Sequence, residues 1–388
     1  MKFRVERDEF TDAVAWTART LPTRATTQLQ VLAGLLLDAT GDGLKVAAFD
    51  YEVSAQADVA ANVGDPGRGL VNGKMLADIT KSLPDAPVDV AVDGTRLTLV
   101  CGNSRFALPM LPVDDYPSLP PMPETVTGVV PGLVFGSAVA QVAIAAGRDD
   151  TLPVLTAVRV EVTGDKLTLA ATDRYRLGVR TIDWQRNTGD TEETTALVPA
   201  KTLADLARHA GKNDVVLHFG TGKSGEALAG FEIAGRKTTT RLIEGTFPPY
   251  RKLLPDSTPL AARVDIGPLT EAVKRVALVA PRTAPVKLTF TTDNLVLEAG
   301  TGGEAQASEA LPVAYDGPEL VVHYNPAYLL DALGVIEEKT AQFGFASAED
   351  MTLAGNKPAI LTGVSGDENA EVNPDGYRYL LMPIRSNG

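Results

Sequence analysis

The sequence predicts an α+β protein built from three similar domains, each with two helices packed on antiparallel sheet. Short landmarks recur at intervals near 127 residues, and segments with alternating apolar positions, typical of strands, follow stretches with helical periodicity. At 388 residues the chain is also too long for one ordinary core, so its length alone favours two or three domains.

The clearest landmark is a Leu-x-Asp segment, found in "GKMLADI", "AKTLADL" and "PAYLLDAL". Its aspartates, Asp78, Asp205 and Asp331, are 127 and 126 residues apart. A second pair of similar segments, 40–53 and 163–177, is offset by 123 residues. Two independent landmarks with nearly the same period indicate three repeats, each large enough to be a domain.

Proline-rich stretches at 116–125 and 247–259 mark the junctions between the repeats. We therefore expect domains at 1–125, 126–254 and 255–388.

Within each repeat the same order of elements is expected. A first helix is predicted at 10–21, 137–147 and 269–280, alternating strands such as "LTLAATD" follow, and the Leu-x-Asp landmark opens a second helix. In the middle copy the predicted exposed face is Lys201, Asp205, Arg208 and Lys212, and the predicted buried stripe is Leu203, Leu206, Ala207 and Ala210.

The composition restricts the class of protein. The net charge of −13 argues against simple adhesion to nucleic acid, which a basic excess usually supplies. The single cysteine, Cys101, rules out an internal disulfide framework and fits a reducing compartment. We find no apolar signal segment in "MKFRVERDEF" and no run that approaches a membrane span, so we expect a cytoplasmic protein without membrane contact.

The sequence shows no convincing catalytic chemistry. The string "GTGKSG" (220–225) satisfies G-x-G-x-x-G, but a phosphate loop needs glycine where Leu217 stands, and alternating residues rather than a helix follow. We therefore interpret it as a hairpin loop. His209, His218 and His323 lack the spacing of metal ligands. We interpret the pairs of adjacent acidic residues as solvent-exposed rather than as acid/base pairs. We predict a non-catalytic protein with no metal and no cofactor.

Three stretches in order, "ATDRYRLGV", "IEGTFPPYRKLLP" and "YLLMPIR", with the opening "MKFRVER", resemble the bacterial DNA polymerase III β subunits, the replicative sliding clamps. The resemblance covers the whole chain. It implies a head-to-tail homodimer that closes a six-domain ring around duplex DNA, with sheet outside and helices lining the hole. The implied function is that of a processivity factor, which tethers polymerase to DNA without regard to sequence. A topologically linked ring needs no tight phosphate grip, so the acidic charge is compatible with it.

The resemblance also implies a pocket between the second and third domains for short linear peptides of the polymerase, the clamp loader and repair proteins. Its implied residues are Leu155, Thr172, Arg174, Tyr175, Arg176, Leu177, Pro248, Lys252, Leu253, Asn325, Tyr328, Met382, Pro383, Ile384 and Arg385. An apolar cleft with a few polar anchors suits an extended peptide. Alternatively, Leu380 and Met382 simply complete the last sheet. Both roles are compatible, because alternate residues of one strand can face the core and the pocket.

Three features depart from the family pattern near this pocket. Arg174 stands where the family often has a small residue, and Lys252 stands where some members carry arginine, which would weaken a bidentate contact. The extension at 386–388 passes the usual chain end.

Cations on the helices, and in loops after the first helices, are candidates to face DNA: Arg24, Lys74, Lys81, Arg148, Lys201, Arg208, Lys212, Lys274 and Arg275. For any one of them, a solvated surface residue is an equal alternative.

For the contact between subunits, "NSRFALP" matches an edge strand of the family's first domain and implies Arg105, Phe106 and Leu108. Its mate is the end of the third domain's first helix, with Leu278 and Val279, and Arg105 or Lys74 would pair with Glu304 or Glu309. The alternative for Phe106 and Leu108 is the core of their own domain. Two other hypotheses stay open: a three-repeat scaffold that never encloses DNA, and an enzyme, supported only by "GTGKSG".

Overall fold

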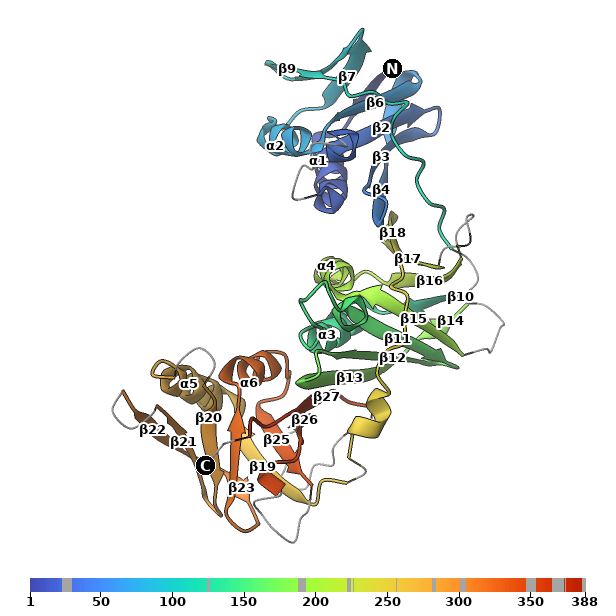
Figure 1. The fold of residues 1–388 in the computed structure, drawn as a ribbon. Helices are drawn as coiled ribbons and strands as arrows, with labels where there is room; N and C mark the ends of the chain where they lie inside the picture. Colours follow the sequence, from blue (N-terminus) through green and yellow to red (C-terminus); the bar gives the residue numbers. More distant parts are fainter. Residues whose placement is uncertain are drawn as a thin grey trace. The chain divides into compact units, whose positions relative to one another are not determined.

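The computed structural model describes residues 1–22, 30–123, 126–187, 193–221, 225, 227–255, 257–280, 284–300, 305–346, 354–364, 373 and 375–385. Figure 1 shows its helices and strands in chain order. The described residues form two compact units. The first comprises Met1–Val130, Arg186–Asp190 and Asn213–Leu242, and the second comprises Pro131–Gln185, Thr191–Lys212 and Ile243–Gly388.

The first unit contains two antiparallel sheets. Sheet A has the order β5-β1-β7-β8-β9, with bounds β1 Lys2–Val5, β5 Ala61–Asp65, β7 Val88–Asp93, β8 Arg96–Cys101 and β9 Ser104–Pro109. Sheet B has the order β14-β10-β16-β17-β18-β4-β3-β2-β6. Its bounds are β2 Gly34–Thr40, β3 Gly43–Phe49, β4 Val53–Val59, β6 Gly67–Asn72, β10 Val126–Val130, β14 Gln185–Arg186, β16 Val215–Thr221, β17 Ala227–Ile233 and β18 Arg236–Arg241.

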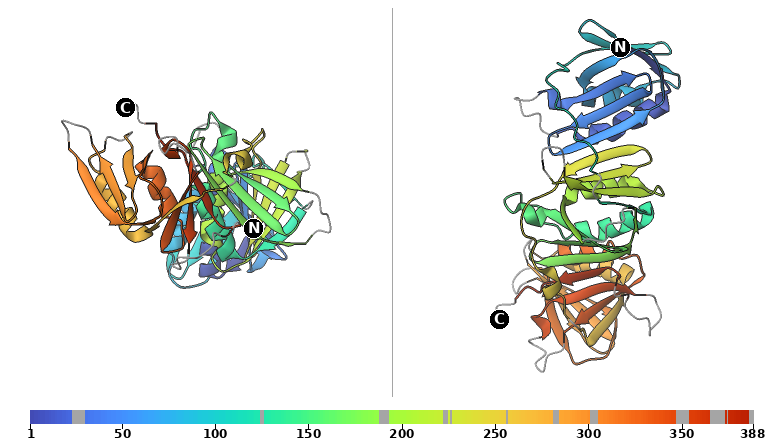
Figure 2. Two further views of the ribbon diagram at one scale, coloured as in Figure 1. Left: turned by 90° about the horizontal axis from the view of Figure 1, so that it is seen from below. Right: turned by 90° about the vertical axis from the view of Figure 1, so that its right-hand side faces the viewer.

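Sheet B runs across the expected boundary between the first and second domains. Strand β18 pairs with β4, so that Thr239 lies opposite Ser54, and their buried hydroxyls are hydrogen-bonded at 2.5 Å. Figure 2 shows the blue strands of the first repeat running alongside the yellow-green strands β17 and β18.

Helices α1 (Arg7–Thr17) and α2 (Gly73–Ser82) pack against each other in this unit. Phe10 anchors α1 because its ring is fully buried and meets Phe3 edge to face, with centroids 6.4 Å apart. The Asn72 side chain caps α2 by accepting a hydrogen bond from the backbone N–H of Met75.

The second unit repeats this plan. Sheet C has the order β15-β11-β12-β13-β27-β26-β25-β19-β23, with bounds β11 Ala157–Thr163, β12 Lys166–Thr172, β13 Arg176–Asp183, β15 Thr194–Pro199, β19 Leu260–Asp265, β23 Ala314–Tyr315, β25 Thr340–Phe345, β26 Ala359–Val364 and β27 Arg378–Leu381. Sheet D has the order β22-β21-β20-β24, with bounds β20 Val286–Phe290, β21 Asn294–Ala299, β22 Ala307–Pro312 and β24 Leu320–Tyr324. Because β13 pairs with β27, sheet C also crosses an expected domain boundary.

The helices of this unit are α3 (Gly132–Ala143), α4 (Ala200–Ala210), α5 (Ile266–Ala277) and α6 (Pro326–Leu333). Helix α3 packs against α4, and α5 packs against α6. Short 3-10 turns lie at Ala18–Thr20, Gln30–Ala33, Pro153–Thr156 and Tyr250–Leu253. No helix among the described residues has the length and apolar character that crossing a membrane requires.

The predicted α+β class and the repeated helix pairs are confirmed, but several helix bounds were wrong. The first helices of the repeats begin three to five residues before their predicted starts, and α3 begins at Gly132, directly after Pro131, rather than at Ser137. Burial of Phe135 in the core holds this earlier turn. Lys212 does not share the exposed face of α4, because the helix ends at Ala210 and Gly211 takes a φ of 55°.

Other predictions about the elements are confirmed. Leu203, Leu206, Ala207 and Ala210 are buried along α4. Strands β16 and β17 pair as a hairpin around "GTGKSG", of which residues 222–224 lie outside the described residues. The domain boundaries at 125 and 254 remain predictions.

Candidate peptide site and cationic helix faces

A tight turn between β12 and β13 carries the central residues of the candidate pocket. The Asp173 carboxylate accepts hydrogen bonds from the backbone N–H groups of Tyr175 at 3.0 Å and Arg176 at 3.1 Å. Arg174 has a φ of 81°, in the left-handed region that favours glycine. The turn leaves Arg174 and Tyr175 exposed and buries Thr172 and Arg176.

Arg176 is a buried cation held by two carboxylates. Its Nε donates to Asp173 at 2.9 Å, and its Nη1 donates to Asp331 at 2.6 Å and to the Tyr379 hydroxyl at 3.3 Å. Its guanidinium carbon lies 4.3 Å from the centre of the Tyr328 ring. Burial opposes the charge, but Tyr379 and Asp331 more than offset this and raise the pKa of the guanidinium above its ordinary value. The side chain thus joins β13 to α6 and β27.

A cavity of about 650 Å³ opens between this turn, the loop after α3 and the first turns of α6. Tyr175 and Tyr328 both line it, as does Leu155. The ring of Tyr175, which is 56% exposed, stacks on that of Tyr328 with centroids 6.5 Å apart and planes inclined by 26°. The cavity therefore has an aromatic wall backed by the Arg176 cation.

The chain's last described residues lie beside this wall. Leu380 and Leu381 are buried in β27, where they complete sheet C. Beyond the strand, the Met382 N–H donates to the Tyr175 carbonyl at 3.0 Å and the Ile384 N–H donates to the His323 carbonyl at 2.8 Å. Met382 remains 39% exposed. The strand is therefore part of the core, and the tail after it lies at the surface.

The segment with "FPPYRKLLP" lies on the same sheet and is held by Glu161 of β11. The buried Glu161 carboxylate accepts hydrogen bonds from the Tyr250 hydroxyl at 2.8 Å, from Arg251 and from Arg159. Phe247 and Tyr250 pack in one buried cluster with Leu177 and Leu380. Lys252 and Leu253 are exposed and Pro248 is half-buried.

The predicted pocket residues therefore differ in where they lie. Leu155, Arg174, Tyr175, Arg176 and Tyr328 line the cavity. Thr172 and Leu177 lie beneath the surface, while Pro248, Lys252, Leu253 and the tail residues Met382, Pro383, Ile384 and Arg385 lie at it. Asn325 is half-buried, and its side chain caps α6 by accepting a hydrogen bond from the Ala327 N–H.

Three side chains that hold this site together, Asp173, Asp331 and Tyr379, are absent from the set predicted from sequence. Asp331 carried a signal, because it is the third copy of the Leu-x-Asp landmark. Its counterpart in the second repeat, Asp205, instead pairs with Arg208 on the exposed surface of α4.

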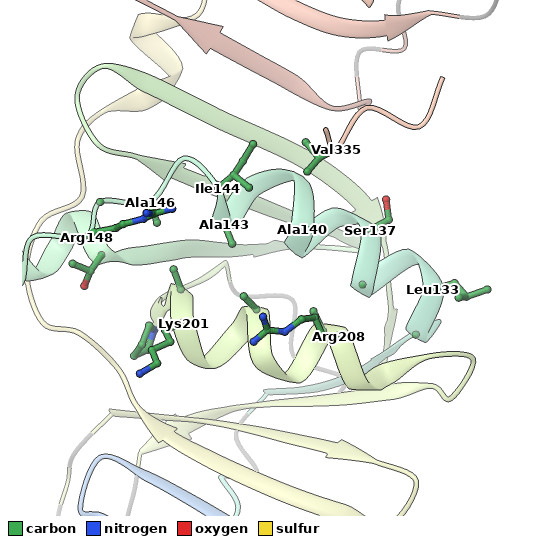
Figure 3. Close-up of a pocket in the computed structure, with 18 of the residues that line it drawn as sticks. Leu133, Ser137, Ala140, Ala143, Ile144, Ala146, Arg148, Lys201, Arg208 and Val335 are labelled. Carbon is green, nitrogen blue, oxygen red and sulfur yellow. The ribbon is translucent and has the colours of Figure 1, made fainter. Parts of the chain in front are cut away.

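The helix faces carry the candidate DNA-facing cations. A groove of about 1150 Å³ between α3 and α4 is lined largely by glycines and alanines of both helices. Figure 3 shows Arg148, Lys201 and Arg208 along this groove. On the other helices, Lys74 and Lys81 are exposed on α2, and Lys274 and Arg275 are exposed on α5. Arg24 lies outside the described residues.

Several of these cations are already paired with carboxylates. Besides the Arg208–Asp205 pair, Lys274 binds Glu271 at 2.8 Å, and Arg275 binds both oxygens of Glu309, at 2.6 and 3.0 Å. The Arg275 bond holds the pKa of the Glu309 carboxyl below its ordinary value. These pairs reduce the net positive field of the helix faces.

The candidate interface residues differ in exposure. Leu278 is 83% exposed at the end of α5, Arg105 is exposed, and Phe106 and Val279 are half-buried. Leu108 is 2% exposed, which favours the alternative that it belongs to the core of its own domain, and its assignment to the interface remains a prediction. Glu304 lies outside the described residues.

Comparisons with known proteins agree over the whole chain. Models of the DNA polymerase III beta subunit match its N-terminal domain at residues 1–120, its central domain at 129–249 and its C-terminal domain at 251–372. The beta sliding clamp of Streptomyces coelicolor is 49% identical over 389 residues and is covered completely, as is this chain. The beta sliding clamp of Micrococcus luteus is 45% identical over 80% of this chain and 99% of its own length.

Solved structures give the same result. A Pseudomonas aeruginosa sliding clamp bound to griselimycin superposes over all of both chains with a TM-score of 0.88 and 26% identity. The chain therefore belongs to the DNA polymerase III beta subunit family, the sliding clamps that act as non-catalytic processivity subunits of that polymerase.

Proposed function

We propose that two copies of the chain join head to tail into a ring of six domains that encircles duplex DNA. Each chain would contribute domains 1–125, 126–254 and 255–388, and the protein would act in the cytoplasm. The observation that supports an encircling tether over a tight DNA binder is the electrostatic balance. The net charge is −13, and Arg208, Lys274 and Arg275 already bind carboxylates of the same chain. Fewer unpaired cations mean fewer released counterions and a weaker phosphate grip, which favours sliding.

The proposed DNA-facing residues are those of the helix faces and the loops after them: Arg24, Lys74, Lys81, Arg148, Lys201, Arg208, Lys212, Lys274 and Arg275. The proposed interface joins Arg105, Phe106 and Leu108 of one copy to Leu278, Val279 and Glu304 of the other.

Loading onto DNA tests the ring. The protein is incubated with a clamp loader and nicked circular DNA, and the DNA-bound fraction is isolated by gel filtration before and after the circle is linearised. Retention on the circle and loss from the linear form is expected of a topological link. Equal retention on both forms would point to ordinary adhesion, and no retention on the circle would contradict encirclement.

We infer that the cavity, the turn and the tail form one site for short linear peptides of DNA polymerase, clamp loader and repair proteins. The proposal is supported by two backbone hydrogen bonds, which attach Met382 to Tyr175 and Ile384 to His323. They place an exposed methionine, which adapts to different side chains, beside an aromatic-walled cavity.

Fluorescence anisotropy with a labelled peptide, a glutamine followed by a downstream Leu-Phe pair, tests the site. The intact chain is compared with a Met382→Ala, Pro383→Ala variant and with a matched control, Met75→Ala, which alters a methionine that is 50% exposed on α2. Saturable binding to the intact chain and to the control, lost in the tail variant, is expected. Unchanged binding by the tail variant would remove the tail from the site.

A further inference from the structure

A row of four side chains connects the exposed Tyr175 ring to an ion pair between the buried Arg176 and Asp331, whose side chain is 40% exposed and lines the cavity. Asp331 accepts a hydrogen bond from Arg176 at 2.6 Å, the Arg176 guanidinium lies against the Tyr328 ring at 4.3 Å, and that ring stacks on Tyr175. The side chain of Arg176 is 5% exposed, whereas Tyr175 is largely exposed. The orientation of the surface ring thus depends on a chain of contacts that begins at Asp331.

Tyr379 holds two members of the same row by hydrogen bonds. Its hydroxyl accepts a hydrogen bond from Arg176 at 3.3 Å and donates to the Tyr328 carbonyl at 3.1 Å. Burial raises the pKa of this hydroxyl, so it stays neutral and able to donate at any physiological pH. Asp173 holds the other side of the guanidinium at 2.9 Å. The row is therefore fixed from three elements: the β12–β13 turn, α6 and β27.

We propose that Asp331 is a positioning residue for the peptide site. By holding Arg176 beneath Tyr328, it fixes the Tyr328–Tyr175 stack as a rigid wall between the cavity and the tail, and so determines how tightly a peptide binds. A wall that is ordered before binding costs the complex less conformational entropy than one that must be ordered during it. This inference rests on the proposed peptide-binding function of the same site.

The repeat supplies a matched control. Asp205 is the landmark aspartate of the second repeat, but it pairs at 3.0 Å with Arg208 on its own helix, and that arginine is 70% exposed. Asp205→Asn therefore makes the same chemical change, at the equivalent place in a repeat, without touching the aromatic stack.

The test is a double-mutant cycle on the full-length chain, read by anisotropy with the labelled Gln…Leu-Phe peptide. The variants are Asp331→Asn, Tyr175→Ala, the double variant and Asp205→Asn, each checked by thermal melting. We expect Asp331→Asn to weaken binding about tenfold, within the usual coupling between residues in one network. The double variant should bind no more weakly than Tyr175→Ala alone, Asp205→Asn should bind like the intact chain, and Asp331→Glu should recover most of the affinity.

Independent, multiplying losses in the double variant would overturn the inference, because Asp331 would then act by a route other than the stack. An unchanged affinity in Asp331→Asn would overturn it as well, while leaving the peptide site intact. Failure of the unaltered chain to bind the peptide would reject the proposed site, and the inference with it. If Asp331→Asn does not fold, Tyr328→Leu interrupts the same row, and it is expected to show the same lack of additivity with Tyr175→Ala.

Discussion

Glu161 is a buried carboxylate that fastens the segment before the third repeat to β11. It receives hydrogen bonds from Tyr250, Arg251 and Arg159. Burial alone would raise the pKa of this carboxyl, but the bonds from Arg251, Tyr250 and Arg159 outweigh it and lower the pKa below the ordinary 4.5. A group with a lowered pKa in the folded state stabilises the fold above its unfolded pKa and loses that contribution as the pH falls through its folded value.

Glu161→Gln is expected to lower the free energy of unfolding at pH 7 by about 2 kcal/mol, since it leaves two arginines with a weaker acceptor. In thermal melts, the difference in Tm between this variant and the parent chain should shrink as the pH drops below 4.5. Glu298→Gln removes a half-exposed pair with Lys287 and serves as the control, with an expected loss under about 1 kcal/mol. Equal losses in both variants would show that the buried network adds nothing.

Arg174 has a left-handed backbone conformation, which lowers the stability of the folded state. Its φ of 81° disfavours a side chain, and the residue closes the turn that presents Tyr175. Arg174→Gly is expected to raise the stability by about 0.5 kcal/mol, because relief of strain exceeds the extra entropy of a glycine in the unfolded chain. Arg174→Ala keeps the strain and should give no rise in Tm. A rise in both variants would instead implicate the charge.

Strand β27 and the tail that follows it differ in burial within a few residues. In β27, Leu380 lies opposite Leu177 and Ile360, and Leu381 is fully buried. Met382 continues the chain and is 39% exposed. The apolar run near the end of the sequence is therefore partly core and partly surface.

Leu381→Ala is expected to destabilise the protein by about 3 kcal/mol, as is usual for a truncated core leucine, and to weaken peptide binding only through the folded fraction. Met382→Ala should cost less than about 1 kcal/mol in stability while reducing peptide affinity directly. Denaturant unfolding and anisotropy titration on both variants separate the two effects. A large loss of stability in Met382→Ala would assign the tail to the core as well.

At the scale of the whole molecule, the proposed ring depends on an exposed apolar side chain at the end of α5. Leu278 is 83% exposed, so a partner that covered it would gain the free energy of burying an apolar side chain. Leu278→Asp is expected to shift the native mass from a dimer to the 40.9 kDa monomer, measured by light scattering at micromolar concentration, without lowering the Tm of the monomer. Leu133→Asp changes a leucine that is 64% exposed on α3 and should leave the dimer intact. A monomeric parent chain, or dissociation by both variants, would contradict the proposed interface.

The sequence determined the repeats, the α+β class and the family, because these follow from local patterns: landmark spacing, alternation and the three motifs in order. It also located the buried stripe of α4. It did not predict where the first helices start. In α3 the earlier start depends on the burial of Phe135 in the core, which is a tertiary contact.

Only the tertiary structure decided which side chains meet across the repeats. Arg176 and Asp331 lie 155 positions apart, yet they form the ion pair that supports the aromatic wall. The same landmark aspartate in the second repeat instead pairs with an exposed arginine of its own helix, Arg208. The sheets likewise cross the expected domain boundaries, because β4 and β13 gain hydrogen-bonded neighbours, β18 and β27, from later in the chain. Local sequence pattern predicts each helix and strand. Which elements pack or pair with one another depends on burial and hydrogen bonding between segments distant in the sequence, and the local pattern of a single sequence does not reveal these contacts.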